Sequence, residues 1–394
     1  MSTELVDRVR RRLASDGTPL DAAAVAKAVR AESGGVAGHT DVLDAVRLLS
    51  REFVGAGPLE PLLDDLDTTD VLVTAPDEVW VDGAGGLRRT EVRFSDQESV
   101  RRLAQRLALA AGRRLDDAQP YVDGWLPGSA SRATVRLHAV LPPVAADGPC
   151  VSLRVLRPAA HDLDALHRLG TVDSDGLALL HAVLAARLAF LVSGATGAGK
   201  STLLAALLRA VPESERILCV EDVGELRPPH PQLVRLIARP ANVEGAGEVN
   251  LRDLVRQALR MRPDRLVIGE ARGAEVVELL AALNTGHEGS AGTIHANSPT
   301  EVPARLEALA ALGGLSRPAL HSQLAAAVDL VLHMARQRDG TRQLTEIGVV
   351  RRGAEAATGH TDVEVRAVWR RGRWTADGAL LRDLLRERLG EGPC

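Results

Sequence analysis

The chain has 394 residues, a formal net charge of −4 at pH 7 and only 2% aromatic residues. This length allows two or three domains, and the 45% hydrophobic content indicates a globular protein with a sizeable core. The acidic balance excludes a global basic footprint for nucleic acid and leaves room only for a local patch. Three widely spaced cysteines, Cys150, Cys219 and Cys394, support neither a zinc site nor a disulfide framework.

Residues 1–156 predict an N-terminal helical segment followed by an α+β domain. Apolar residues recur at helical spacing over 1–50, and the start MSTELVDRVRRRL lacks the apolar core of a signal peptide. We therefore expect a soluble, intracellular protein. For 51–156 the sequence predicts a basic amphipathic helix at 100–111 and strands at 71–74, 79–82, 90–94, 134–141 and 150–156.

The polar segment 157–175 is predicted to be a linker. Beyond it, apolar strands alternate with helices through 176–352, which predicts an α/β domain with a mostly parallel sheet covered by helices. Within this domain, Asp339-Gly340 between two apolar runs predicts a hairpin. The terminal segment, 353–394, is expected to form a weaker hairpin around Arg371-Gly372 and a helix at 380–389.

The stretch GATGAGKS, residues 194–201, predicts a phosphate-binding loop because an apolar strand precedes it and a helical pattern follows it. Its glycines let consecutive backbone N–H groups curl around a polyphosphate at the positive end of the new helix. Lys200 can reach the β- and γ-phosphates, and the Ser201 hydroxyl can bind Mg²⁺. We expect ATP and Mg²⁺ as cofactors, with nucleotide-binding residues Gly194, Thr196, Gly197, Gly199, Lys200, Ser201 and Thr202.

Lysine usage supports this site. Lys27 and Lys200 are the only lysines of the chain, which otherwise uses arginine for its positive charge. Lys200, one of these two lysines, lies at the loop position where a compact ammonium is needed and a planar guanidinium would fit poorly.

Two acidic side chains follow apolar strands after the loop. Glu221 ends the run ILCVE, and Glu270 follows LVIG. Because ligands of open parallel sheets bind beyond the carboxyl ends of the strands, both carboxylates are expected near the nucleotide, as Mg²⁺ ligands or as groups that orient and deprotonate water. Either acid alone would be read more simply as a helix cap or a surface charge. His295 ends another strand-like run and could sense the γ-phosphate, whereas His287 is expected to be structural.

These residues resemble a known family. The stretches GATGAGKST, EDVGEL, LRMRPDRLVIGEARGAE and NTGHEGSAGTIHANS are similar to the Walker A, Asp-box, Walker B and His-box motifs of the type II/type IV secretion ATPases. GEARGAE and the upstream stretches GAGPLEPLL and GRRLDDAQP resemble the tight-adherence (Tad/Flp) pilus branch and its conjugal-transfer-associated members. The resemblance covers residues 50–350, and the zinc-binding cysteines of the general type II branch are absent.

The resemblance implies a ring-forming, usually hexameric ATPase with a RecA-like domain preceded by a smaller α+β N-terminal domain. It implies that Glu221 and Glu270 share water activation and Mg²⁺ support, without apportioning these roles, and that His295 senses phosphate. Arg136 and Arg154 match N-domain arginines that stabilise the transferred phosphoryl group. The family's DARLPDGSR segment reads DGWLPGSASRATVR here, so Arg132 rivals Arg136 for one position.

The favoured hypothesis is a cytoplasmic ATPase, peripherally associated with the plasma membrane, that acts on inner-membrane platform proteins to assemble a Flp/Tad-type pilus or to drive secretion. One alternative is a RecA-like motor that translocates DNA in conjugal transfer. The acidic balance and the scarcity of aromatic residues for base stacking make nucleic acid an unlikely partner. The other alternative is a nucleotide-dependent switch with little turnover, which the acidic pair Glu221 and Glu270 disfavours.

Overall fold

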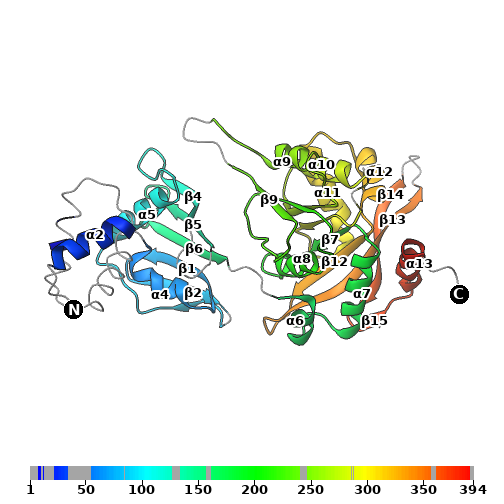
Figure 1. The fold of residues 1–394 in the computed structure, drawn as a ribbon, viewed down its shortest axis with the longest axis horizontal. Coiled ribbons are helices and arrows are strands. Elements are labelled where there is room, and N and C mark those ends of the chain that lie inside the picture. The colour runs from blue at the N-terminus through cyan, green and yellow to red at the C-terminus, as the bar shows by residue number, and fades with distance from the viewer. Residues whose placement is uncertain are drawn as a thin grey trace. The chain divides into compact units, whose positions relative to one another are not determined.

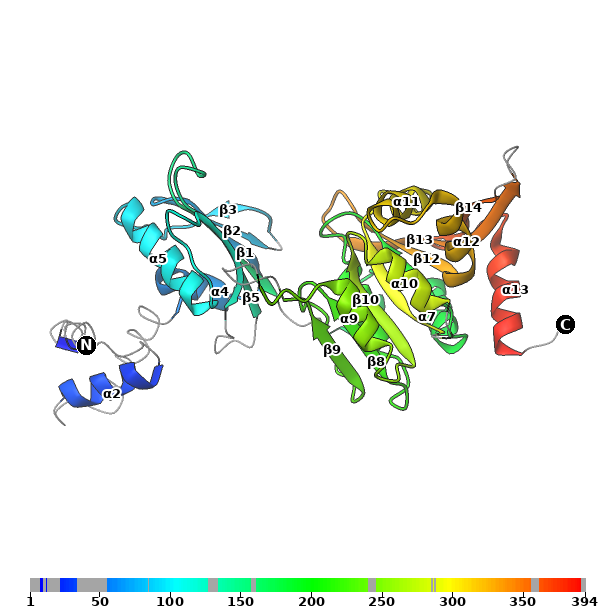
Figure 2. The ribbon, with the colours of Figure 1, turned by 90° about the horizontal axis from the view of Figure 1, so that it is seen from above.

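A computed structural model describes residues 8–9, 12, 22–33, 55–83, 85–126, 134–156, 161–239, 246–284, 286, 288–355 and 361–390. The chain forms two compact units, Met1–Arg157 and Pro158–Cys394. Figures 1 and 2 show the elements of each unit. Among the described residues, no helix combines the length and the apolar character that crossing a membrane requires.

The first unit contains a six-stranded antiparallel sheet with the strand order β3-β2-β1-β6-β5-β4. The strands are β1 (Thr68–Ala75), β2 (Glu78–Gly83), β3 (Arg88–Arg89), β4 (Tyr121–Leu126), β5 (Thr134–Val140) and β6 (Cys150–Leu156). The helical elements are α2 (Ala22–Ser33), η1 (Gly57–Leu59), α4 (Glu60–Asp64) and α5 (Gln97–Ala110). A capping box between Asp96 and Ser99 begins α5 and satisfies backbone N–H groups that the first helical turn leaves unpaired.

Buried and more exposed residues alternate along these strands, so one face of the sheet packs in the core with α4 and α5. Val135 and Leu137 of β5 and Leu153 of β6 are buried with Leu63 of α4 and Leu103 of α5. Residues of the opposite parity, which include the charged side chains of β5 and β6, therefore point to the other face.

Two predictions for this unit differ from the structure. The strand expected at 90–94 is not formed, because pairing with β2 ends at Arg88–Arg89 and a turn-like segment follows. Strand β4 was not predicted, since YVDGWL carries an aspartate and a glycine in its centre. Gly124 is required there because a Cβ would lie 2.9 Å from the Ala111 Cβ.

The second unit is built on a nine-stranded sheet with the order β15-β14-β13-β12-β7-β11-β10-β8-β9. Strands β12, β7, β11, β10, β8 and β9 are parallel, and β13 to β15 add antiparallel strands at one edge. The parallel strands are β7 (Phe190–Ser193), β8 (Ile217–Glu221), β9 (Leu233–Ile237), β10 (Arg265–Ala271), β11 (Ala291–Ile294) and β12 (Leu330–Arg336); the others are β13 (Arg342–Glu355), β14 (Thr361–Arg370) and β15 (Arg373–Trp374). The predicted α/β class with a mostly parallel sheet is confirmed.

Helices cover both faces of this sheet, which explains why its central strands are continuous apolar runs. One core joins the sheet to α6 (Leu163–Arg168), α7 (Ser174–Ala185), α8 (Lys200–Arg209) and α13 (Gly378–Leu389). The other joins it to α9 (Leu251–Ala258), α10 (Val276–Leu283), α11 (Val302–Leu312) and α12 (Arg317–Ala327), with the short η2 (Pro299–Glu301) before α11. The two groups lie on opposite sides of the sheet in Figure 1. Neither α11 nor α12 was predicted.

The boundaries of the second unit also differ from the prediction. Leu163 and Leu166, in the segment predicted to be a linker, are buried in the core beneath α8, and α7 already begins at Ser174. Within 157–175, folded structure of the second unit is therefore present from Leu163 onward. The terminal hairpin and helix of 353–394 extend the same sheet, because β14 pairs along β13 and Leu381 of α13 is buried against it.

Candidate functional site

The loop between β7 and α8 has the backbone that phosphate binding requires. Gly194, Gly197 and Gly199 have φ values of 149°, 73° and 95°, in a region that favours glycine. At Gly194 a Cβ would collide with the backbone oxygen of Met334, so a larger residue cannot be placed there without displacing β12. The first N–H groups of α8 lack intrahelical partners and are directed into this loop.

Lys200 lies inside the loop and is 7% exposed. Its Nζ donates to the Gly194 and Ala195 carbonyls, each at 2.9 Å, and lies 3.3 Å from His295 Nδ1. Burial lowers the pKa of Lys200, and the Glu270 carboxylate opposes this effect. The ammonium is therefore held by loop carbonyls next to the end of β11.

Glu221, at the end of β8, is 2% exposed. Its Oε1 accepts hydrogen bonds from the Glu225 and Leu226 N–H groups at 3.0 and 2.9 Å, and its Oε2 lies 3.7 Å from Arg235 Nε. Burial raises the pKa of Glu221 to about 7, although these hydrogen bonds and the Arg235 charge oppose the increase. The carboxyl can thus change its protonation state near neutral pH.

Glu270 lies near the carboxyl end of β10, the neighbour of β8, and contacts two basic side chains. Its carboxylate pairs closely with Arg272 and with His295 Nε2. Burial lowers the pKa of His295, and the Lys200 ammonium lowers it further. A chain of short contacts therefore links Lys200, His295 and Glu270 across the ends of β11 and β10.

Ser201 connects the loop to the end of β8. Its Oγ donates to Glu225 Oε2 at 3.3 Å, and the Glu225 N–H binds Glu221. At the adjacent strand end, a Cβ on Gly269 would lie 2.6 Å from Glu221 Cγ, so the absence of a side chain lets the two carboxylate-bearing ends approach. The structure thus brings Lys200, Ser201, Glu221, Glu270 and His295 to one edge of the sheet.

The remaining expected nucleotide ligands also lie on this loop and helix. Thr196 is exposed in the loop, and Thr202 is half-buried in the first turn of α8. His287 and Arg132 lie outside the described residues.

Arg136 and Arg154 belong to the first unit, where they are directly paired neighbours on β5 and β6. Arg136 makes a two-pronged ion pair with Asp123, at 2.8 and 2.7 Å, and Arg154 Nε lies 3.0 Å from Asp70 Oδ1. Their guanidinium groups therefore lie together on the sheet face that α4 and α5 do not cover.

Several residues at the loop were assigned no role from the sequence. Glu225 and Arg235 contact Glu221, His333 Nδ1 lies 2.9 Å from Ser193 Oγ, and Arg342 Nε donates to the Gly197 carbonyl at 2.9 Å. Only Glu225 offered a local signal, because it lies in EDVGEL. The others reach the site through strand pairing.

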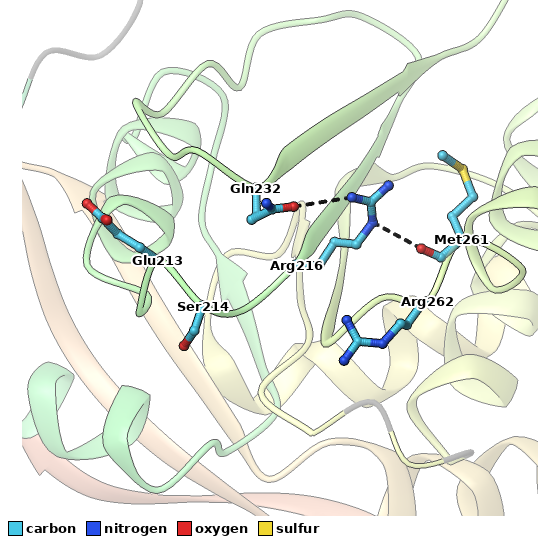
Figure 3. Close-up of a pocket in the computed structure, with 6 residues that line it drawn as sticks. All are labelled: Glu213, Ser214, Arg216, Gln232, Met261 and Arg262. Carbon is cyan, nitrogen blue, oxygen red and sulfur yellow. Dashed lines mark hydrogen bonds between the residues drawn. The ribbon is translucent and has the colours of Figure 1, made fainter.

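A separate cavity of about 360 Å³ lies at the opposite edge of the sheet, where β8, β9 and β10 begin. Arg216 donates to Gln232 Oε1 at 3.2 Å and to the Met261 carbonyl at 3.0 Å, and Arg262 and Glu213 also line the cavity (Figure 3). The candidate site lies at the carboxyl ends of the same strands, so this cavity is distinct from it.

The family model described as "Type II/IV secretion system protein" matches residues 52–373. A putative conjugal transfer protein of Mycobacterium tuberculosis is 64% identical over 353 residues, which cover 89% of this chain and 99% of the relative. The probable conjugal transfer protein TrbB of Sinorhizobium fredii is 30% identical over 286 residues, covering 71% and 82%.

A solved structure of the pilus retraction motor PilT with bound ADP has a similar fold. Its TM-score is 0.53 at 20% identity, and the match covers 82% of this chain and 85% of that one. The DotB ATPase of Legionella pneumophila has a TM-score of 0.51 at 21% identity, covering 74% and 79%. These two likenesses concern the fold.

Proposed function

Because the chain belongs to the type II/IV secretion system protein family, we propose that it hydrolyses Mg²⁺-bound ATP to power a secretion or pilus-assembly machine of the Flp/Tad type. The observation that supports this proposal most strongly is the convergence of Lys200, Glu221, Glu270 and His295 on one phosphate loop. A single lysine and two carboxylates at the ends of parallel strands suit phosphoryl transfer to water.

The residues present fit a magnesium ion delivered with the nucleotide. Ser201 Oγ and the carboxylates of Glu221, Glu225 and Glu270 are hard oxygen donors, and Glu221 Oε2 accepts no hydrogen bond from the described residues. Mg²⁺ prefers oxygen ligands and is commonly held by one or two protein groups together with substrate phosphates. When bound, it would neutralise charge on the phosphate oxygens.

In this proposal each side chain has a distinct task. Lys200 exchanges its loop carbonyls for phosphate oxygens, and backbone N–H groups of the loop hold the phosphate chain. One of Glu221 and Glu270 orients the attacking water and takes its proton, while the other supports the metal ligands. His295, in contact with both Lys200 and Glu270, reports whether the terminal phosphate is present.

Arg136 and Arg154 are proposed to supply the charge that stabilises the transferred phosphoryl group. Their present partners, Asp123 and Asp70, are in the same unit, and these pairs are at least partly exposed. Exposed ion pairs contribute roughly 0–1 kcal/mol each, so replacing a carboxylate by a phosphoryl oxygen costs little free energy. In this proposal ATP binding would be accompanied by that exchange and would couple hydrolysis to motion.

We place the working protein in a ring of six copies, in keeping with the family resemblance. The ring would lie at the cytoplasmic face of the plasma membrane, where platform proteins receive the motion. A DNA-translocating motor remains the alternative because similar proteins carry the name conjugal transfer protein. The net charge of −4 and the 2% aromatic content favour a protein substrate over DNA, since binding the DNA backbone needs clustered cations. A salt-sensitive, several-fold stimulation of ATPase activity by DNA would favour the alternative.

Glu270→Gln tests the reaction directly. The variant should bind ATP with wild-type affinity but hydrolyse it at least ~100-fold more slowly, the scale of losing a general base or water-orienting group. Glu288→Gln, which removes an exposed carboxylate paired with Arg388 in the same unit, is the matched control and should retain activity. Wild-type turnover in Glu270→Gln would remove Glu270 from the mechanism and leave Glu221 as the candidate base.

A further inference from the structure

We propose that the hairpin of β12 and β13 forms the nucleoside part of the ATP site, with the Arg342 guanidinium against the ribose and base. This inference rests on the proposed ATPase function and adds to it a ligand subsite outside the phosphate loop. It starts from the contact of Arg342 Nε with the Gly197 carbonyl at 2.9 Å.

The hairpin is fixed against the loop at several points. Ser193, the last residue of β7, binds His333 of β12 at 2.9 Å, and the Met334 carbonyl closes against Gly194. On the β13 side, the Leu344 N–H donates to the Thr171 carbonyl at 2.9 Å. Arg342 is therefore presented to the loop by a rigid support.

The order of the strands gives the direction of the nucleotide. Strand β7, which leads into the loop, has β11, β10 and β8 on one side and β12 and β13 on the other (Figure 1). Two groups expected at the terminal phosphate lie on the first side: Glu270 near the end of β10 and His295 directly after β11. A bound triphosphate with its γ-phosphate there must direct its nucleoside away from these strands, toward the side where Arg342 lies.

The chemistry of Arg342 suits this position. Its methylene groups run along the start of α8, with Cδ 3.3 Å from the place of a Cβ on Gly199, and the side chain is exposed. A guanidinium is planar and permanently charged, so it can stack on a base while also donating hydrogen bonds. Because Nε already binds Gly197, the group is oriented before the nucleotide arrives.

The second unit has few aromatic side chains on which a base could stack. Phe190, Trp369 and Trp374 are its only aromatic residues in the sequence. The first two are buried, and Trp374 carries Arg382 at 5.0 Å from its ring centre. The planar guanidinium of Arg342 can therefore take the place of an aromatic ring beside the phosphate loop.

The test compares ADP with inorganic tripolyphosphate, which has phosphates but no nucleoside. Calorimetric binding would be measured for wild type, Arg342→Ala, Arg342→Lys and the control Arg338→Ala, an exposed arginine at the tip of the same hairpin. For Arg342→Ala we expect the Kd for ADP to rise about tenfold, as for loss of one base-stacking contact, and the Kd for tripolyphosphate to change less than about twofold. Arg342→Lys keeps the charge but not the planar group and should still weaken ADP binding.

Two results would overturn the inference. Equal weakening of ADP and tripolyphosphate by Arg342→Ala would show that Arg342 only braces the loop or contacts phosphate. Unchanged ADP affinity would show that it contacts no part of the nucleotide. Both results differ from failure of the proposed function, in which the wild-type protein itself would bind neither ADP nor ATP.

Discussion

Glu221→Gln is predicted to stabilise the second unit, increasingly as the pH rises. Glu221 is 2% exposed, and burial raises its pKa from 4.5 to about 7. A carboxyl with a higher pKa in the folded chain binds its proton more tightly there. Its burial therefore leaves stability intact below about pH 4 and lowers it as the pH rises through 7.

The size of the effect follows from this shift. At 1.36 kcal/mol per pKa unit, the raised pKa of Glu221 lowers the free energy of unfolding, relative to its value at low pH, by about 3 kcal/mol at pH 8 and by about 1 kcal/mol at pH 5. Glutamine is not ionised at either pH. The stability of Glu221→Gln relative to wild type should therefore improve by about 2 kcal/mol between pH 5 and pH 8. The interaction with Arg235 is already included in this shift, because the Arg235 charge opposes the increase in the pKa of Glu221.

The assay is urea unfolding followed by tryptophan fluorescence in a Trp80→Phe, Trp125→Phe background, where Trp369 and Trp374 report on the second unit. The control is Val223→Ala, which changes a side chain that does not ionise. Its stability relative to wild type should be nearly independent of pH. A pH-independent difference for Glu221→Gln would refute the conclusion that burial sets the protonation of this carboxyl.

Two further predictions concern the geometry of the site. Gly269→Ala should reduce ATPase activity at least about tenfold, because the new Cβ would lie 2.6 Å from Glu221 Cγ. The control Gly292→Ala, whose Cβ would lie 3.4 Å from its nearest atom, should have a much smaller effect. Equal activities of the two variants would show that Glu221 need not be held in place. Arg154→Ala and Lys200→Ala subunits, co-assembled and verified by differential tags, should show no recovery of ATPase activity if each arginine acts on the ATP of its own chain; partial recovery would indicate that a neighbouring subunit supplies it.

The sequence predicted the parts of the site that are contiguous in the chain. GATGAGKS, the two strands that end in Glu221 and Glu270, and the strand before His295 each carry their own local pattern, and the parallel order of such strands brings their ends to one edge. The hairpin at Asp339-Gly340 was predictable for the same reason, since its turn residues lie between two apolar runs.

The contacts between distant segments were not predictable in this way. Arg235 reaches Glu221 only because β9 pairs beside β8, and β9 carries a weak signal since four of its five residues are half-buried. Arg342 meets the loop 145 residues away through the pairing of β12 with both β7 and β13. The segment 157–175 was predicted to be a linker because most of its residues are polar. Leu163 and Leu166 gave no local signal of burial, since they are buried by packing with α8.

The most direct test of the account is steady-state phosphate release by the purified protein with Mg²⁺ and ATP, compared with Lys200→Ala. Lys200 is the group that the loop carbonyls hold beside His295, and an arginine-rich chain offers no other lysine near this position in the sequence. We expect Mg²⁺-dependent turnover by wild type and loss of turnover in Lys200→Ala, with the variant still folded by circular dichroism. Undiminished turnover in Lys200→Ala would contradict the assignment of the site.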